Sequence, residues 1–214
     1  MPARLALVSA LLCAVAWPAR AADKAIYLQP LGRALPAADV ALVKKALVAF
    51  YALPVKLLPR VPLPAKAYYP PRRRYRAERL LHFLKTRLPA DGDRILGLTA
   101  VDISTTKGRY RDWGILGLAT LEGRVCVISS FRARKKARSP LHARIRLAKV
   151  AVHEVGHTLG LEHCPRRGCL MEDARGKVAT SDREYDICQR CRAKLRAWRR
   201  PIPAKPEIPW PRPR

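Results

Sequence analysis

The order of apolar and polar residues predicts strands alternating with helices along most of the chain. Short apolar runs bounded by proline, glycine or aspartate are typical of buried strands, whereas apolar residues spaced three or four apart indicate helices. Strands are expected over residues 25–32, 54–59 and 94–103, with two more joined at Glu122 and Gly123 within residues 114–131. Helices are expected over residues 37–52, 75–88, 139–159 and 181–198.

This alternation predicts a mostly parallel sheet with helices packed on it. The short connection between Leu121 and Val125 allows only an antiparallel pair, so one strand must run against the others. Residues 61–74 contain four prolines, and we expect them to form a connector without a regular strand ladder. The last helix is expected to begin with a capping box of Ser181 and Glu184.

The chain length of 214 residues suits one domain, which we assign to residues 22–200. Residues 1–21 have a basic start at Arg4, an apolar run too short to span a membrane, and small residues up to Ala21. These features predict a signal peptide cleaved after Ala21 and a secreted or periplasmic protein with no transmembrane segment in the mature chain. The Pro-rich residues 201–214 are expected to be an extended, poorly ordered tail.

The chain is strongly basic, with 43 Lys and Arg against 16 Asp and Glu. The net charge is +27, and loss of the signal peptide, which contains Arg4 and Arg20, leaves +25. Such a charge favours binding to anionic polymers or surfaces. The basic residues are scattered over several segments, however, so no dedicated nucleic-acid groove is expected.

Three histidines in the stretch "HEVGHTLGLEH" have the spacing of a zinc site. His153 and His157 are four residues apart, so on a helix they project from one face and can hold one ion. Gly160 lets the chain turn and bring His163 to the same ion as a third ligand. Three imidazoles leave the fourth position of Zn²⁺ open, as in catalytic zinc sites, and Glu154 is placed to act as the general base.

Four cysteines follow this motif in the chain: Cys164, Cys169, Cys188 and Cys191. Their spacing, one pair separated by four residues and one by two, suits a closed structural zinc site. Disulfides are the alternative, because an exported protein matures in an oxidising compartment. A bridge between Cys188 and Cys191 would close a tight ring, and Cys126 makes the mature count odd, so we favour zinc.

Taken together, these residues resemble the archaemetzincins, a family of metzincin-type zinc metallopeptidases. The resemblance rests on "HEVGHTLGLEHC", Cys169, Met171 and "CQRC", and extends upstream to the strands within residues 94–131. It implies two zinc ions per chain: a catalytic one on the three histidines, with Glu154 as base, and a structural one on the four cysteines. It also assigns Met171, otherwise an ordinary core residue, to the methionine turn beneath the catalytic ion.

The resemblance further implies an α+β fold: a twisted mixed sheet whose antiparallel edge strand, residues 114–120, lines the cleft above the active-site helix. We therefore expect an exported, monomeric zinc peptidase acting on a peptide or protein substrate. The alternative is a catalytically weak, metal-stabilised basic protein that binds anionic polymers or surfaces, for which salt-sensitive retention without hydrolysis would be the sign.

Overall fold

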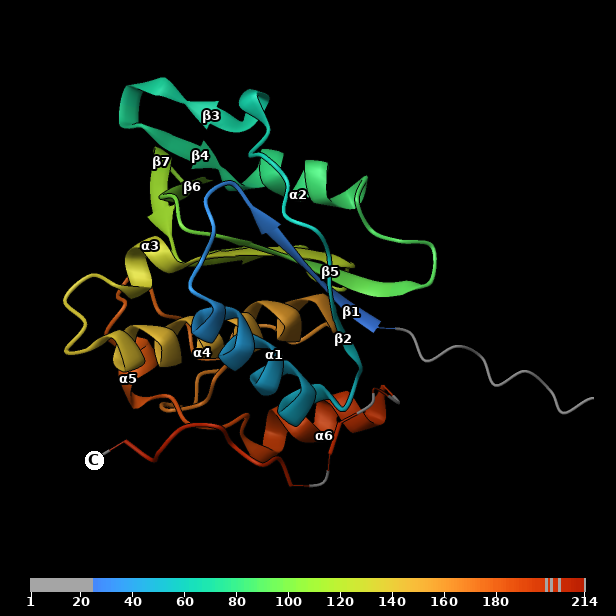
Figure 1. Cartoon of the computed structure of the whole chain (residues 1–214). Helices are drawn as coiled ribbons and strands as arrows, with labels where there is room; N and C mark the ends of the chain where they lie inside the picture. Colours follow the sequence, from blue (N-terminus) through green and yellow to red (C-terminus); the bar gives the residue numbers. More distant parts are fainter. Residues whose placement is uncertain (1–24, 199, 201, 204, 214) are drawn as a thin grey trace, which may run out of the picture.

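The structure, a computed structural model, describes residues 25–198, 200, 202–203 and 205–213, and the expected signal peptide lies outside this range. These described residues form two sheets and six α-helices (Figure 1). The main sheet has the order β2-β1-β5-β9-β8: β2 (Val55–Leu57), β1 (Ala25–Leu31), β5 (Gly92–Thr99), β9 (Val125–Ser129) and β8 (Gly117–Ala119). Its strands are parallel except β8, which is antiparallel to β9 at the sheet edge.

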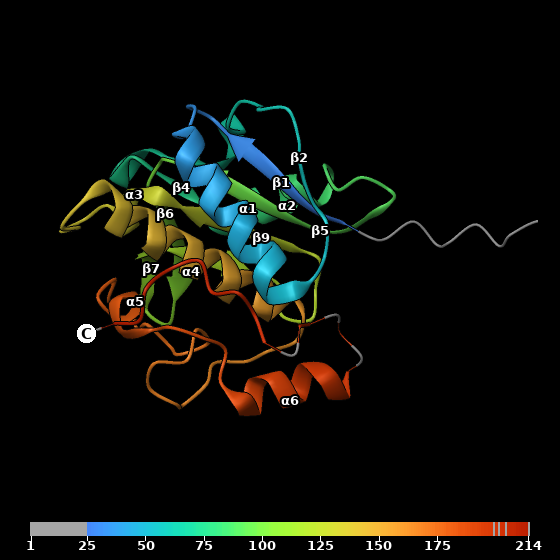
Figure 2. The same ribbon diagram turned by 60° about the horizontal axis from the view of Figure 1, so that its bottom comes forward.

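Helices cover both faces of the main sheet (Figures 1 and 2). The helices α1 (Ala37–Tyr51) and α4 (Pro140–Thr158) pack on one face, and α2 (Ala77–Lys85) packs on the other. Consecutive residues of β5 alternate between these two cores: Leu96 faces α1 and α4, whereas Ile95 faces α2. Three further helices are α3 (Ser130–Ala133), α5 (Thr180–Arg183) and α6 (Gln189–Ala197).

The main sheet and its covering helices confirm the predicted mixed α and β fold, including the antiparallel edge strand. That strand is shorter than expected, because Gly114 and Ile115 belong to β7, which lies in a different sheet. Turn residues Glu122, which has a φ of 54°, and Gly123 connect β8 to β9 as predicted.

A second sheet, which the sequence does not reveal, lies above the main one in Figure 1. It has the order β3-β4-β6-β7, and two of its strands come from or directly follow the Pro-rich connector. The strands are β3 (Tyr68–Tyr69), β4 (Arg74–Arg76), β6 (Ile103–Lys107) and β7 (Tyr110–Ile115), and two 3₁₀ turns occupy Ala65–Ala67 and Pro70–Arg72. The expected irregular connector is therefore wrong in part, because strands of two or three residues escape the restriction that proline places on longer ladders.

The predicted last helix is divided in two. Ser181 does not cap a helix, because its hydroxyl donates to the carbonyl of Val178, and Glu184 is extended at the end of α5. The final helix instead begins after Cys188, which is its N-cap residue. The segment between α5 and α6 is thus free to line the active-site cleft.

The described part of the C-terminal tail packs on the domain through Trp210. Trp210 is 5% exposed, stacks on Phe50 with ring centroids 5.5 Å apart, and donates its indole N–H to the carbonyl of Tyr185. Within the described residues, every helix is too short or too polar to cross a bilayer.

Candidate metal centres and active-site cleft

Helix α4 carries the first part of the site and has the boundaries that its sequence predicts. The hydroxyl of Ser139 accepts from the backbone N–H of His142 at 3.0 Å, and Pro140 occupies the first turn, where no N–H partner is needed. The helix ends at Thr158, and Gly160 follows with a φ of 99°, a conformation that glycine adopts without strain. The glycine reverses the chain and brings His163 back to the helix.

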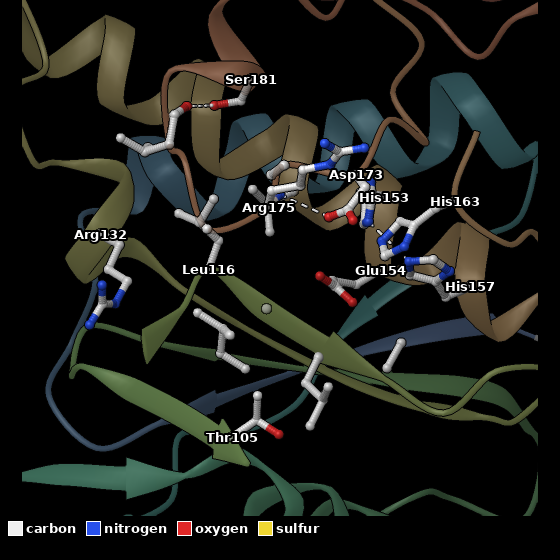
Figure 3. A pocket seen from close by; sticks show the side chains of 18 of the residues that line it. Thr105, Leu116, Arg132, His153, Glu154, His157, His163, Asp173, Arg175 and Ser181 are labelled. Atoms are coloured by element: carbon white, nitrogen blue, oxygen red, sulfur yellow. Dashed lines mark hydrogen bonds between the residues drawn. The ribbon is translucent and has the colours of Figure 1, made fainter. Parts of the chain in front are cut away.

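The three predicted histidines converge. Donor atoms of His153, His157 and His163 all lie within 4.8 Å of one another, and the three rings are grouped in Figure 3. The Nε2 atoms of His153 and His157 are 3.0 Å apart. Two nitrogens of a tetrahedral zinc site lie about 3.4 Å apart, so this separation is close to that of ligands sharing an ion.

Backbone carbonyls fix which nitrogen of each helix histidine can bind a metal. His153 donates from Nδ1 to the carbonyl of Leu170 at 2.7 Å, and His157 donates from Nδ1 to that of Leu161 at 2.6 Å. Both Nε2 atoms then carry lone pairs, so the contact between them is not a hydrogen bond and calls for a cation. Burial lowers the pKa of His153 to about 3 and of His157 to about 4, which keeps both imidazoles neutral and able to bind zinc.

Glu154 lies on the same helix beside the histidines and faces the cleft (Figure 3). It is 6% exposed, and burial raises its pKa to about 8. A divalent cation held by the neighbouring imidazoles favours the ionised carboxylate and opposes this shift. The environment thus suits a carboxylate that exchanges protons near neutral pH.

Met171 lies directly beneath the helix. It is fully buried, and a Cβ at Gly156 would come within 2.6 Å of its sulfur, so the thioether packs against the helix between the two histidine turns. Its role as the methionine turn stays a prediction from the resemblance. Leu170, which accepts from His153, is its neighbour in the chain, so this turn also orients a ligand.

The four predicted cysteines form a second, separate cluster. Their sulfur atoms lie within 4.8 Å of one another, with Cys164 and Cys188 3.7 Å apart and Cys169 and Cys191 4.0 Å apart. Sulfurs of a tetrahedral zinc–thiolate site are about 3.8 Å apart, whereas disulfide sulfurs are about 2 Å apart. The arrangement fits zinc rather than disulfides, and all four thiols are free.

The surroundings of the cluster favour the thiolate form of one cysteine, Cys169, whereas burial raises the pKa of Cys164 and the contact with Cys169 raises that of Cys191. Hydrogen bonding from Cys191 lowers the pKa of Cys169 to about 5, and the backbone N–H groups of Cys188 and Met171 act in the same direction against burial. The fifth described cysteine, Cys126, lies in the sheet core, where burial raises the pKa of its thiol. Cys126 is therefore separate from both metal sites.

A cavity of about 840 Å³ runs between α4 and the strands β7 and β8. The three histidines and Glu154 line it from the helix, and the edge strand β8 lines it from the other side. A Cβ at Gly117 in β8 would lie 2.6 Å from Oε1 of Glu154, so glycine leaves the room that this carboxylate occupies. The predicted cleft between edge strand and active-site helix is present.

Four contributors to the site are absent from the sequence prediction. The carbonyls of Leu161 and Leu170 orient the histidines, Gly117 makes room for Glu154, and Glu184 lines the far end of the cavity. Backbone carbonyls carry no residue-type signal. Gly117 could have been noticed as a glycine within an apolar strand, a pattern that marks close approach of another group.

A helix with two histidines and a glutamate, a third histidine after a glycine turn, and an adjoining cleft define a zinc metallopeptidase site. Comparisons with known proteins agree, because residues 37–197 match peptidase family M54. The chain belongs to this family.

Its relatives include archaemetzincins. The archaemetzincin of Haloquadratum walsbyi is 31% identical over 173 residues, which cover 78% of this chain and 96% of the relative. That of Halobacterium salinarum is 33% identical over 137 residues, covering 60% of this chain and 75% of the relative. The crystal structure of archaemetzincin from Methanopyrus kandleri is similar, with a TM-score of 0.71, 28% identity and coverage of 84% of this chain and 97% of that one.

The chain is thus a zinc metallopeptidase of the archaemetzincin type, and its two donor sets are consistent with two zinc ions.

Proposed function

We propose that the chain hydrolyses peptide bonds with Glu154 as general base and with the histidine site as the catalytic metal centre. The observation that carries this proposal is the placement of Glu154, which lines the same cavity as the three histidines and has its pKa raised by burial. Zinc bound there would act as a Lewis acid on the scissile carbonyl and lower the pKa of a water molecule. The fully thiolate second site leaves no open position and is proposed as structural.

Glu154, the helix histidines and the edge strand have different roles in the proposed reaction. A carboxylate oxygen of Glu154 takes a proton from the attacking water and then delivers it to the nitrogen of the leaving amine. The imidazoles of His153 and His157 stay neutral and oriented through their Nδ1 hydrogen bonds to backbone carbonyls. The free edge of β8 can pair with an extended substrate backbone, since only its other edge is bonded to β9.

The test is a Glu154→Gln variant, which keeps the size of the side chain but cannot accept the proton. We expect it to retain two zinc ions per chain and to lose peptide hydrolysis by a factor of about 10² to 10⁴. Glu162→Gln, which removes an exposed carboxylate from the same cavity, is the matched control. A Glu154→Gln protein with full zinc and wild-type rates would overturn the assignment.

We also propose that the chain is exported. The support is the sequence of residues 1–21, with its basic start, short apolar run and small residues before the expected cleavage point. Amino-terminal sequencing of protein recovered from outside the cytoplasm should begin at Ala22. Recovery of the uncleaved chain in the cytoplasm would contradict the proposal. Binding of anionic polymers stays a prediction from the charge.

A further inference from the structure

The charge of the cleft differs from that of the chain. Five acidic side chains line the cavity: Glu154, Glu162, Glu172, Asp173 and Glu184. Four cationic side chains also line it: Lys107, Arg132, Lys135 and Arg175. The whole chain has 43 basic and 16 acidic residues, so nearly a third of its carboxylates face this one cavity. The basic net charge of the chain therefore does not describe the charge of the side chains that line the cavity.

Glu184 is the unusual member of this set. It is only 4% exposed, and no hydrogen bond or ion pair within the described part of the chain reaches its carboxylate. Glu172, by comparison, is paired with Arg183, and Asp173 accepts from the backbone N–H of Arg175. A buried carboxylate without a partner is unfavourable, so a ligand that brings a cation to it would be stabilised.

The nearby cation, Lys149, is already engaged elsewhere. Its ammonium donates to the backbone carbonyls of Ser181 at 2.8 Å and Glu184 at 2.6 Å, and it forms no ion pair with the Glu184 carboxylate. Burial raises the pKa of Glu184 to about 8 although Lys149 acts in the opposite direction. Lys149 therefore holds the backbone of the segment between α5 and α6 and leaves the carboxylate for another partner.

The cationic side chains that line the cavity offer no comparable buried place for an acidic side chain. The guanidinium of Arg132 is bidentate on Asp102, at 2.7 and 3.0 Å, so its charge is already compensated. The other three cationic side chains, Lys107, Lys135 and Arg175, are exposed at the rim. Apart from Glu154, which lies beside the histidine site, the buried cavity group without an ion pair in the described part of the chain is thus the carboxylate of Glu184.

The position of Glu184 indicates which residue of a bound peptide lies within its reach. The backbone carbonyl of Glu184 accepts a hydrogen bond from the ammonium of Lys149. Lys149 precedes His153 by four residues, which is about 6 Å along the helix axis. One peptide residue in extended form spans about 3.3 Å, and a lysine or arginine side chain covers the remaining distance. A residue next to the scissile bond can therefore reach Glu184.

The edge strand indicates on which side of the bond this residue lies. Gly117 at the start of β8 adjoins Glu154, and Glu122 beyond its end bonds to the carbonyl of His157, so β8 and α4 run in the same direction. A peptide paired antiparallel to β8, the more stable arrangement, runs from the His157 end toward Val150. Its residue after the scissile bond then faces Val150, Val178 and Glu184, which line that end of the cavity.

We propose that Glu184 determines specificity by binding the side chain of a lysine or arginine immediately after the scissile bond. This proposal rests on the proposed peptidase function. The neighbouring Val150 and Val178 contact the aliphatic part of that side chain, and the carboxylate receives its charged end. A basic side chain suits this subsite better than an apolar one of the same length, because only the basic one supplies the missing partner.

The test compares two peptides that differ only after the cleaved bond, one with lysine and one with norleucine. For the wild-type protein we expect kcat/KM for the lysine peptide to be higher by a factor on the order of 10 to 100, the range of a hydrogen bond to a charged group. Glu184→Gln should bring this ratio close to one, and Glu184→Lys should favour a glutamate peptide. The Glu162→Gln control should keep the wild-type ratio, which excludes a general effect of cavity charge.

Binding separates this proposal from the catalytic one. In a Glu154→Gln background, calorimetry should show tighter binding of the lysine peptide, and adding Glu184→Gln should remove that difference while zinc content stays at two. If Glu154 proves dispensable, the lysine-to-norleucine ratio of the wild type still tests Glu184. A wild-type ratio near one, or a ratio that Glu184→Gln leaves unchanged, would overturn the proposal even if variants of Glu184 fold poorly.

Discussion

Gly117 of the edge strand and Glu154 of the active-site helix occupy adjoining space, with only 2.6 Å between the place of a Cβ at 117 and Oε1 of Glu154. The strand that is proposed to align the substrate therefore also bounds the carboxylate that is proposed to accept the proton. A side chain at 117 and the present position of Glu154 are mutually exclusive.

Gly117→Ala should displace the Glu154 carboxylate without touching either metal site. Because small misplacements of catalytic groups are costly, we expect kcat/KM for peptide hydrolysis to fall about 10- to 100-fold. Zinc content and the urea midpoint should stay close to those of the wild type. Ala119→Gly, on the same strand, is the control and should retain most of the activity; an equal loss in both variants would point to the strand backbone instead.

Removal of one sulfur should affect one metal site and the stability of the loop around Met171. Cys188→Ser is expected to leave about one zinc per chain and to lower the free energy of unfolding by several kcal/mol, since metal binding contributes directly to folding. Cys126→Ala, which changes a cysteine outside the cluster, should retain two zinc ions. Two zinc ions in Cys188→Ser would argue against this residue as a ligand.

The C-terminal tail should contribute to stability through Trp210. Trp210→Ala removes the stacking on Phe50 and the hydrogen bond to Tyr185, and we expect it to cost about 2–4 kcal/mol in urea unfolding. Trp210→Phe keeps the ring contact and should cost about 1 kcal/mol. Leu141→Ala, at a 55% exposed position, is the surface control. No effect of Trp210→Ala would mean that the packed tail adds nothing to stability.

The link between α4 and α5 should depend on pH through Asp182. Burial raises the pKa of this carboxyl, but hydrogen bonds from Arg146 and His142 outweigh burial and lower the pKa to about 2. The folded state then binds fewer protons than the unfolded chain, whose Asp pKa is about 3.9, so this stabilisation is full above that value and is lost as the pH falls toward 2.

The stability difference between wild type and Asp182→Asn, measured by urea unfolding, should therefore be constant from pH 7 to 5 and shrink below about pH 4. Loss of zinc in acid affects both proteins and does not enter the difference. A difference that persists unchanged at pH 3 would show that the carboxylate charge is not the stabilising feature.

The parts of the molecule that the sequence predicts are those with strong local patterns. Helix α4 has a serine cap, a proline in its first turn and a glycine beyond its end, and its histidines follow the helical period. The cysteine cluster follows from spacing, although spacing alone left disulfides open. The sulfur separations of 3.7 and 4.0 Å favour zinc over disulfides.

The missed parts depend on contacts between distant segments. The strands β3 and β4 are two or three residues long, and β4 also pairs with β6, a distant strand that no local pattern near β3 and β4 indicates. Ser181 and Glu184 have capping-box spacing, yet Ser181 lies within the short helix α5, which ends before Glu184, and Lys149 of α4 binds the carbonyls of both residues. Trp210 is buried because it stacks on Phe50, a residue far from it in the chain, which composition cannot show.

The zinc content of the purified, folded chain tests the central claim most directly. Two separate donor sets, three histidines and four free cysteines, predict two zinc ions per chain by elemental analysis. One zinc per chain, with the four cysteines blocked to thiol reagents after unfolding without reductant, would show that disulfides replace the second site. A fully folded chain that contains no zinc would contradict the assignment of both metal sites.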